Sequence, residues 1–331
     1  MRHFRWIGLL LILWPAAMAQ GDSVDPALQG LEGKAALVPF ESAPFPYRGM
    51  IPGDETHDDA PFLDAKNGAR RGHTTPRGGV YWEDETYSDR RSLLYIPKGF
   101  DRRRKGAIVV FLHGNQATLS RDVIQRQRVP QQLAASNLNA VLVAPQLAID
   151  ALDSSAGGFW QPGAFARYLR EADAKLASLA GDSMGAQDFA RLPVILVAYS
   201  GGYLPAAFSL EVGEANRRIA GVILLDAVYD ETETFSGWIA DHQSGAFFFS
   251  AFTPSSARGN GDLQDELMRQ GVDFALDLTP CLAAGDIVLL DTGPSVVHND
   301  FVTQAWVADP LRHLFDRIRA FPRDMAKACT P

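Results

Sequence analysis

The chain has few cysteines: only Cys281 and Cys329 occur among its 331 residues. Two cysteines this far apart do not make a zinc site. In an oxidising compartment they could form one disulfide that ties the C-terminal tail to the body of the protein. Two unpaired buried thiols are the alternative, and the sequence leaves both open.

Positive charge is also scarce. The chain carries 31 Lys and Arg against 39 Asp and Glu, which gives a formal net charge of −8 at pH 7. An acidic balance argues against a nucleic acid or an anionic membrane surface as a partner. The one basic run, residues 102–105, lies between two strand-like segments and is interpreted as a solvated loop.

The N-terminus has the pattern of a secretory signal peptide. Arg2 and Arg5 precede an apolar stretch at residues 6–14, and the small residues Ala17 and Ala19 mark a cleavage site after position 19. The apolar stretch is about half of the ~20 residues that a membrane-spanning helix needs. We therefore expect an exported protein, periplasmic or secreted, with no integral membrane segment after cleavage of residues 1–19.

Residues 20–79 are rich in Pro, Gly and Asp. Such a segment cannot form a regular helix or a central strand. We interpret it as an extended arm wrapped over the main domain, because its scattered aromatic residues argue against a disordered tail. The main domain is then residues 80–331.

From residue 80 onward, apolar strand-like segments alternate with helical ones. Residues 80–86 and 92–97 are predicted to be two antiparallel strands. Buried strands alternating with helices predict an α/β fold, with a mostly parallel sheet covered on both faces. The strands expected in that sheet are residues 107–112, 140–144, 194–198, 221–225, 246–251 and 287–290.

Ser200 follows the apolar run at residues 192–198, where a buried strand would turn sharply into a helix. The pattern around it matches the Gly-x-Ser-x-Gly nucleophile elbow, except that Ala198 replaces the first glycine. Ser-Gly-Gly also makes ordinary turns at strand ends. The pentapeptide alone therefore does not decide between a nucleophile and a structural serine.

Other polar residues also follow predicted strands. His113 ends one strand, Asp226 ends another, and His298 follows the last strand after a short loop. Ligands of such sheets bind outside the carboxyl ends of the strands. The coincidence of these positions favours the interpretation of Ser200 as a nucleophile.

With these residues in place, the chain resembles the α/β-hydrolase superfamily over about residues 80–320. The resemblance implies the order nucleophile, acid, histidine, which Ser200, Asp226 and His298 supply. It also implies an oxyanion hole beside the turn that begins at His113. Its donors would be the N–H of Gly201 and the backbone N–H of Asn115, with Gln116 as the alternative to Asn115.

The position of the acid departs from the usual pattern of the superfamily. Most members of the superfamily place it after the following strand, where this chain has no carboxylate until Asp262. Asp226 ends the preceding strand, a position that some members use, and from there it could accept the Nδ1 proton of His298. Asp230 and Asp262 are the alternatives, and a structural turn carboxylate is the alternative role for Asp226.

His298 is the predicted general base because it follows Ser200 and comes after the last predicted strand by a short loop, whereas His313 lies on the predicted last helix. The aromatic side chains of Phe159, Trp160 and Trp238 are candidates for the substrate pocket, with core packing as the alternative for each. His57 with two adjacent acids lacks the ligand set of a metal site. No metal or other cofactor is implied.

The sequence thus predicts an exported serine hydrolase that cleaves a small-molecule or polymeric ester, or an amide, through an acyl-enzyme on Ser200. The alternative is a secreted binding or cell-envelope protein that keeps the fold without catalysis. The two differ in one observable, because catalysis requires Ser200, His298 and a carboxylate to converge within hydrogen-bond reach. The oligomeric state is left open.

Overall fold

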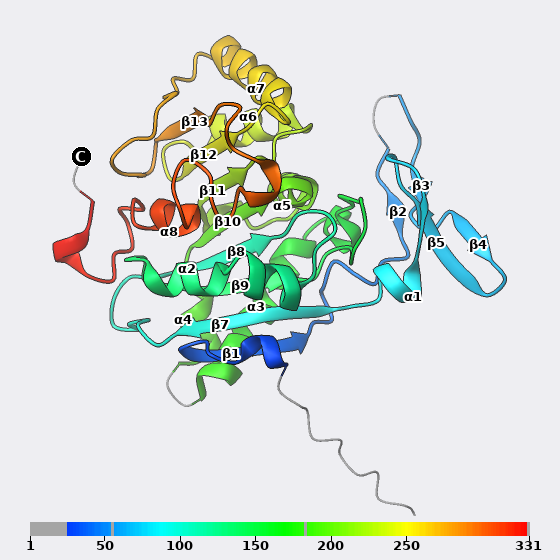
Figure 1. Ribbon diagram of the computed structural model, residues 1–331, viewed down its shortest axis with the longest axis horizontal. Coiled ribbons are helices and arrows are strands. Elements are labelled where there is room, and N and C mark those ends of the chain that lie inside the picture. Colours follow the sequence, from blue (N-terminus) through cyan, green and yellow to red (C-terminus); the bar gives the residue numbers. More distant parts are fainter. Residues whose placement is uncertain (1–24, 54–55, 182–183, 330–331) are drawn as a thin grey trace, which may run out of the picture.

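The computed structural model describes residues 25–53, 56–181 and 184–329. The predicted signal peptide lies outside these ranges, so it stays a prediction. An eight-stranded sheet crosses the body of the protein, with helices on both of its faces (Figure 1). In spatial order its strands are β1 (Gly33–Pro39), β7 (Arg91–Pro97), β9 (Ala140–Pro145), β8 (Ala107–Leu112), β10 (Val194–Tyr199), β11 (Ile219–Leu225), β12 (Phe247–Phe252) and β13 (Ile287–Asp291).

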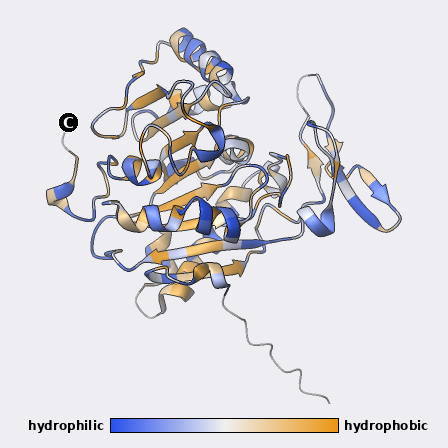
Figure 2. Cartoon of the chain, viewed as in Figure 1, coloured by the Kyte–Doolittle hydropathy of each residue, from blue (hydrophilic) through white to orange (hydrophobic). Residues whose placement is uncertain are grey.

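The sheet is mostly parallel. Neighbouring strands from β9 through β13 run parallel, whereas β7 is antiparallel to both β9 and β1. Every residue of β8, β9, β10 and β12 is buried, as their continuous apolar sequences predict. Figure 2 shows these strands as hydrophobic. The mixed sheet between helical layers is the α/β-hydrolase architecture that the sequence predicts.

Strand β10 shows how the two layers share the core. Because successive side chains of a strand point to opposite faces, Leu196 and Ala198 join one apolar cluster and Val197 and Tyr199 join the other. The first cluster contains buried side chains of α3, α5, α6 and α7, and the second contains buried side chains of η2, α2 and α8. These helices are η2 (Leu119–Arg126), α2 (Val129–Ala135), α3 (Ala164–Ala180), α5 (Tyr203–Glu211), α6 (Thr232–His242), α7 (Ala257–Gln270) and α8 (Pro310–Phe315).

Short helical segments fill the connections. Among the described residues, no helix is long and apolar enough to cross a membrane. The short segments are η1 (Pro26–Leu28), α1 (Glu83–Thr86), η3 (Gly157–Trp160), α4 (Ala186–Ala190), η5 (Ser200–Gly202), η6 (Asn216–Arg218), η7 (His298–Asp300) and η8 (Met325–Lys327).

The N-terminal arm contributes an edge strand to the main sheet. Strand β1 pairs with β7 over its full length, with Gly33 opposite Pro97. The rest of the arm, together with residues 80–82 at the start of the main domain, forms two small antiparallel sheets beside the body (Figure 1). The side chains of Phe40, Phe45 and Phe62 are fully buried in the main core and anchor the arm to it. The small strands are β2 (Met50–Ile51), β3 (Ala60–Pro61), β4 (Ala65–Asn67), β5 (Arg70–Thr74) and β6 (Val80–Trp82).

One predicted pairing is wrong. Residues 80–86 and 92–97 do not pair with each other, because β6 pairs with β5 and β7 lies between β1 and β9. The first of these two segments is a strand only as far as Trp82, and helix α1 begins at the next residue. Three consecutive acidic residues in its first turn favour this helix, since carboxylates interact favourably with a helix N-terminus.

Cys281 and Cys329 form a disulfide, with their Cα atoms 5.6 Å apart. The bond joins the C-terminal tail to the segment before β13. This decides between the two alternatives that the sequence left open.

Candidate active site

Ser200 lies at the turn between β10 and the helical segment that leads into α5. Its φ of 52° is unusual for a residue with a side chain, and its side chain is only partly accessible, with the residue 8% exposed. Backbone in this region costs free energy and is found at sharp functional turns. The structure therefore has the strand-to-helix elbow that the sequence predicts at this serine.

Two glycines allow the backbone to close around the elbow. A Cβ atom on Gly114 would lie 2.8 Å from the Cβ of Ser200, closer than atoms can pack. A Cβ on Gly201 would collide with the Asn115 side chain and lie 2.8 Å from the Oγ of Ser154. The structure thus brings Gly201 and Asn115, the two predicted oxyanion donors, against each other.

Of the two candidates for the second oxyanion donor, Asn115 is the better placed. The N–H of Gln116 donates to the carbonyl of Ala151 at 2.8 Å, so it is not available to a substrate oxygen. The N–H of Asn115 has no acceptor within the described residues. Gly201 lies in the first turn of a helical segment, where N–H groups lack intrahelical partners.

Ser200, His298 and Asp226 form one hydrogen-bonded line. The Oγ of Ser200 lies 2.8 Å from Nε2 of His298, and Nδ1 of His298 lies 2.5 Å from Oδ2 of Asp226. When Nδ1 donates its proton to the carboxylate, Nε2 is the nitrogen that can accept the hydroxyl proton of Ser200. The convergence that distinguishes the catalytic hypothesis from the binding hypothesis is therefore present.

Asp226 is fully buried at the end of β11. Besides the bond from His298, its carboxylate accepts hydrogen bonds from Thr253 N at 2.9 Å, Thr253 Oγ1 at 2.8 Å, Ser255 Oγ at 2.7 Å and Ser256 Oγ. Burial opposes ionisation, but the bonds from His298, Ser256 and the others outweigh it and hold the pKa of Asp226 below its ordinary value.

The alternative acids do not reach the histidine. Asp230 is exposed and accepts from the N–H of Glu231, while the carboxylate of Asp262 lies 3.8 Å from Arg258. The strand end at which most superfamily members carry the acid here supplies Thr253 and its serine neighbours as donors to Asp226. Sequence reasoning did not find this donor group, because hydroxyl residues after a strand have no distinctive spacing.

Two further side chains hold the loop that carries His298, and the sequence did not indicate either. The hydroxyl of Tyr199 donates to the backbone carbonyl of His298 at 2.8 Å, and the two rings stack with centroids 5.4 Å apart. Arg126 donates to the carbonyl of Asn299 at 3.0 Å and is itself bound by the buried carboxylate of Asp122 at 2.9 Å. The only signal for Tyr199 was its place directly before Ser200.

One tyrosine lies beside His298 and contacts a second tyrosine. The hydroxyl of Tyr229 lies 3.4 Å from Nδ1 of His298, and its ring centroid lies 5.8 Å from that of Tyr203. Burial, with smaller effects of Asp230 and Glu231, raises the pKa of Tyr203 to about 12. Burial also raises the pKa of Tyr229. Both phenols therefore remain protonated at neutral pH.

The His113 side chain holds the turn that contains Gly114 and Asn115. Its Nε2 accepts the N–H of Leu147 at 2.9 Å, so its Nδ1 carries the proton that is donated to the carbonyl of Gly114 at 2.8 Å. Burial lowers the pKa of His113 to about 4, which keeps the ring neutral.

The three predicted pocket aromatics lie away from the triad. Phe159 is fully buried against Phe165 and Tyr168, as the core-packing alternative predicts. Trp238 is 6% exposed and stacks on His242. Trp160 lines a large cavity between the arm and α5. In the described part of the chain, no hydrogen bond or ring contact joins any of the three to the triad.

No protein-family model matches the chain, and no curated protein sequence matches it. Solved structures do match it. A mutant feruloyl esterase module from Clostridium thermocellum, complexed with sinapinate, is 13% identical, with 87% of this chain and 95% of that chain covered and a TM-score of 0.47. A thermostable esterase is 13% identical, with coverages of 80% and 73% and a TM-score of 0.39. A dienelactone hydrolase from Anabaena variabilis is 15% identical, with coverages of 68% and 90% and a TM-score of 0.39.

Among the described residues, no group of three or more His, Cys, Asp and Glu side chains is placed to hold a metal ion.

The charge of Asp226 should make the stability of the fold depend on pH. Its folded-state pKa lies below the unfolded value of about 3.9, so it stabilises the fold above that pH, and this contribution is lost as the pH falls through the folded-state pKa. Asp226→Asn should lower the free energy of unfolding by about 2–3 kcal/mol at pH 7. The difference from wild type should shrink below about pH 4 in denaturant titrations.

Asp265→Asn is the control, because Asp265 is an exposed carboxylate on α7. It should leave the stability unchanged at every pH. A difference between Asp226→Asn and wild type that stays constant from neutral to acidic pH would contradict the assignment of a stabilising buried charge.

Proposed function

We propose that this protein is an exported serine hydrolase that cleaves a carboxylic ester through an acyl-enzyme on Ser200. The observation that carries the proposal is the unbroken line from Ser200 Oγ to His298 Nε2 at 2.8 Å and from His298 Nδ1 to Asp226 at 2.5 Å. A nucleophile, a base within hydrogen-bond reach and a third group that orients the base are what acyl transfer requires.

The proposed reaction gives a role to each residue of the site. Ser200 Oγ forms a bond to the ester carbonyl carbon as its proton moves to His298 Nε2, and Asp226 stabilises the resulting imidazolium. The N–H groups of Gly201 and Asn115 bind the oxyanion. His298 then returns the proton to the departing alcohol. In the second half, His298 deprotonates a water that attacks the acyl-enzyme, and Ser200 regains its proton as the acid leaves.

Two features favour catalysis over a binding protein that merely keeps the fold. Ser200 keeps a strained backbone conformation, and Asp226 is buried with all its donors directed at one carboxylate. Each of these features costs free energy of folding. The cost is explained if the two features orient Ser200 and His298 for the reaction. Nothing in the site selects an amide over an ester, so the less demanding ester is proposed.

Export rests on the N-terminal sequence and agrees with the disulfide. Disulfides persist mainly in oxidising compartments outside the cytoplasm, and Cys281 is bonded to Cys329. Fractionation of the native host should find the protein in the periplasm or the medium, with a mature N-terminus at Gln20. A cytoplasmic protein that retains Met1 would contradict export and leave the proposed activity untouched.

Ser200→Ala should abolish the activity. We expect the wild type to hydrolyse short p-nitrophenyl esters and to be labelled by a fluorophosphonate, and kcat to fall by roughly 10⁴-fold or more in the variant, with labelling lost. The control is Ser178→Ala, because Ser178 is an exposed serine on α3. A wild-type protein that resists both reagents would favour the binding hypothesis.

Tyr199→Phe should lower kcat and leave KM unchanged, because the lost hydroxyl holds the backbone of His298 and does not line the substrate path. One hydrogen bond contributes about 0.5–1.5 kcal/mol, so a fall of roughly two- to tenfold is expected in steady-state kinetics. Tyr95→Phe is a matched control, since its buried hydroxyl also donates to one backbone carbonyl, that of Glu32 at 2.8 Å. Equal kcat values for the two variants would exclude a positioning role.

A further inference from the structure

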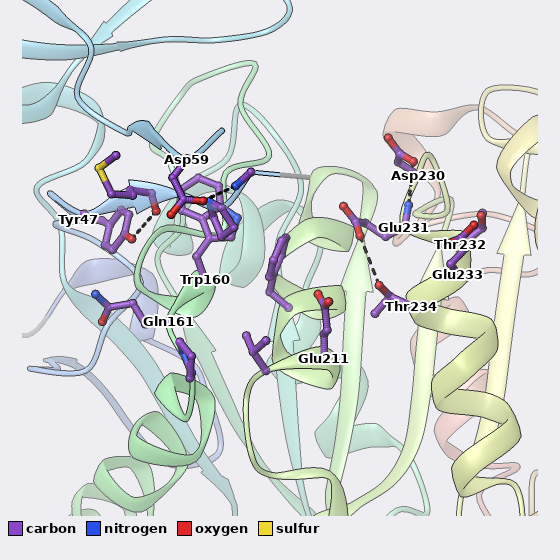
Figure 3. Close-up of a pocket in the computed structure, with 17 residues that line it drawn as sticks. Tyr47, Asp59, Trp160, Gln161, Glu211, Asp230, Glu231, Thr232, Glu233 and Thr234 are labelled. Carbon is purple, nitrogen blue, oxygen red and sulfur yellow. Dashed lines mark hydrogen bonds between the residues drawn. The ribbon is translucent and has the colours of Figure 1, made fainter. Parts of the chain in front are cut away.

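Tyr229 has no role in the proposed reaction, although its hydroxyl lies beside the base. The residue is in the connection between β11 and α6, three positions after Asp226. The next two residues, Asp230 and Glu231, line the large cavity between the arm and α5 (Figure 3). The hydroxyl of Tyr229 instead lies 3.4 Å from Nδ1 of His298. Its side chain therefore contacts the triad, and the side chains after it face the cavity.

Four polar atoms form a closed ring that includes Nδ1 of His298. Oδ2 of Asp226 lies 2.5 Å from this nitrogen and 2.7 Å from Oγ of Ser255. The hydroxyl oxygen of Tyr229 lies 3.3 Å from the same Oγ and 3.4 Å from the same nitrogen. Tyr229 is thus joined to the base directly and to the acid through Ser255.

The direction of each bond in this ring follows from the number of protons. The carboxylate of Asp226 can only accept, so Nδ1 of His298 and Oγ of Ser255 both donate to it. Thr253 Oγ1 lies closer to Asp226 than to Ser255, at 2.8 Å against 3.0 Å. The oxygen of Ser255, whose one proton is used, can accept the proton of Tyr229. The Tyr229 oxygen then turns its lone pairs, and not its proton, toward Nδ1.

The surroundings of Tyr229 keep the phenol in this state. Burial raises the pKa of Tyr229, so it holds its proton at neutral pH. Its ring meets the imidazole of His298 edge-on, with centroids 6.4 Å apart, and contacts the ring of Tyr203 with centroids 5.8 Å apart. The side chain of His298 is 30% exposed. The hydroxyl therefore occupies a place beside Nδ1 that water could otherwise take.

Building on the proposed function, we propose that Tyr229 is a positioning residue for the base, whose hydroxyl oxygen stabilises the imidazolium of His298 and helps to hold its ring on Asp226. The positive charge forms when Ser200 passes its proton to Nε2. A lone pair beside Nδ1 interacts more strongly with this cation than with the neutral ring, so it favours the transition state over the ground state. Tyr199 has a different task, because it holds the backbone of the same residue.

Tyr229→Phe tests the proposal, because it removes the hydroxyl and keeps the ring. The acidic limb of kcat/KM against pH reports protonation of the base in the free enzyme. We expect this limb to move to lower pH by about 0.3–0.7 unit, since loss of the lone pair destabilises the cation. The plateau value of kcat should fall by the equivalent factor of about two to five, with KM unchanged.

Two neighbouring tyrosines supply matched controls. Tyr199→Phe should lower kcat without moving the acidic limb, because its hydroxyl binds the backbone carbonyl of His298. Tyr203→Phe should not move the limb either, because Tyr203 contacts Tyr229 through its ring. An acidic limb that stays in place in Tyr229→Phe would overturn the proposal. A move to higher pH would also overturn it, since the hydroxyl would then be a donor to the histidine.

The charges around the base are the same in all three variants. Asp226 and Arg77 act on Tyr229 electrostatically. Arg126 binds the loop of the base, and Asp300 lies in that loop. Exchange of Tyr for Phe changes none of these charges, so a moved limb reports the lost hydroxyl.

Ser255→Ala tests the orientation of the phenol. Ser255 is the acceptor of the phenol proton, so the hydroxyl of Tyr229 can turn when that acceptor is removed. We expect Tyr229→Phe to move the acidic limb by less than about half as much in a Ser255→Ala background as in the wild type. Equal shifts in the two backgrounds would contradict the assigned direction of the bonds.

A measurement without turnover keeps this proposal distinguishable from the proposed activity. The Nδ1 proton of His298 is followed by proton NMR and assigned by its absence in His298→Gln. In Tyr229→Phe we expect its exchange with water to be at least about threefold faster, because water can take the place of the hydroxyl. If the exchange changes in this way but no ester is cleaved, the role of Tyr229 stands and the hydrolase fails. If esters are cleaved but neither the acidic limb nor the exchange changes, the role of Tyr229 fails and the hydrolase stands.

Discussion

The buried negative charge of Asp226 is the constraint on which the rest of the site depends. An ionised carboxylate without partners in a protein interior costs several kcal/mol, and this one is fully buried. Its donors come from the short connection between β12 and α7 and from the loop of His298, so one charge ties both of these segments to the end of β11. The position of the imidazole follows from the need to satisfy that charge.

The nucleophile elbow at Ser200 and the loop of His298 are also linked through Tyr199, the residue before the serine. The alternation of side chains along β10 places Tyr199 on the face opposite Ala198, where it supports the loop of His298. The chain then turns at Ser200, whose positive φ directs its side chain to Nε2 of the same histidine. Two consecutive residues thus hold the backbone and the ring of His298. A change in either should alter the geometry between base and nucleophile without a change in the fold.

The sequence could predict what depends on local pattern. Continuous apolar runs located the parallel strands, and the ends of those strands located Ser200 and Asp226. It could not predict what depends on register between distant segments. The composition of the arm does not show that Gly33 pairs opposite Pro97. The strand-like pattern before the three acidic residues after Trp82 predicts a strand through residue 86, but these residues form helix α1. The hydroxyls around Asp226 were missed for the same reason, since only the folded chain brings them to it.

The N-terminal arm forms one wall of the cavity beside α5, and aromatic side chains anchor the arm there. Phe45 and Phe62 are fully buried, and the ring of Phe62 contacts Trp160, with centroids 5.7 Å apart. Removing the arm would expose these aromatic side chains, so their burial holds the arm on the body. The separation between the arm and α5 is therefore set by the same aromatic packing that holds the arm in place.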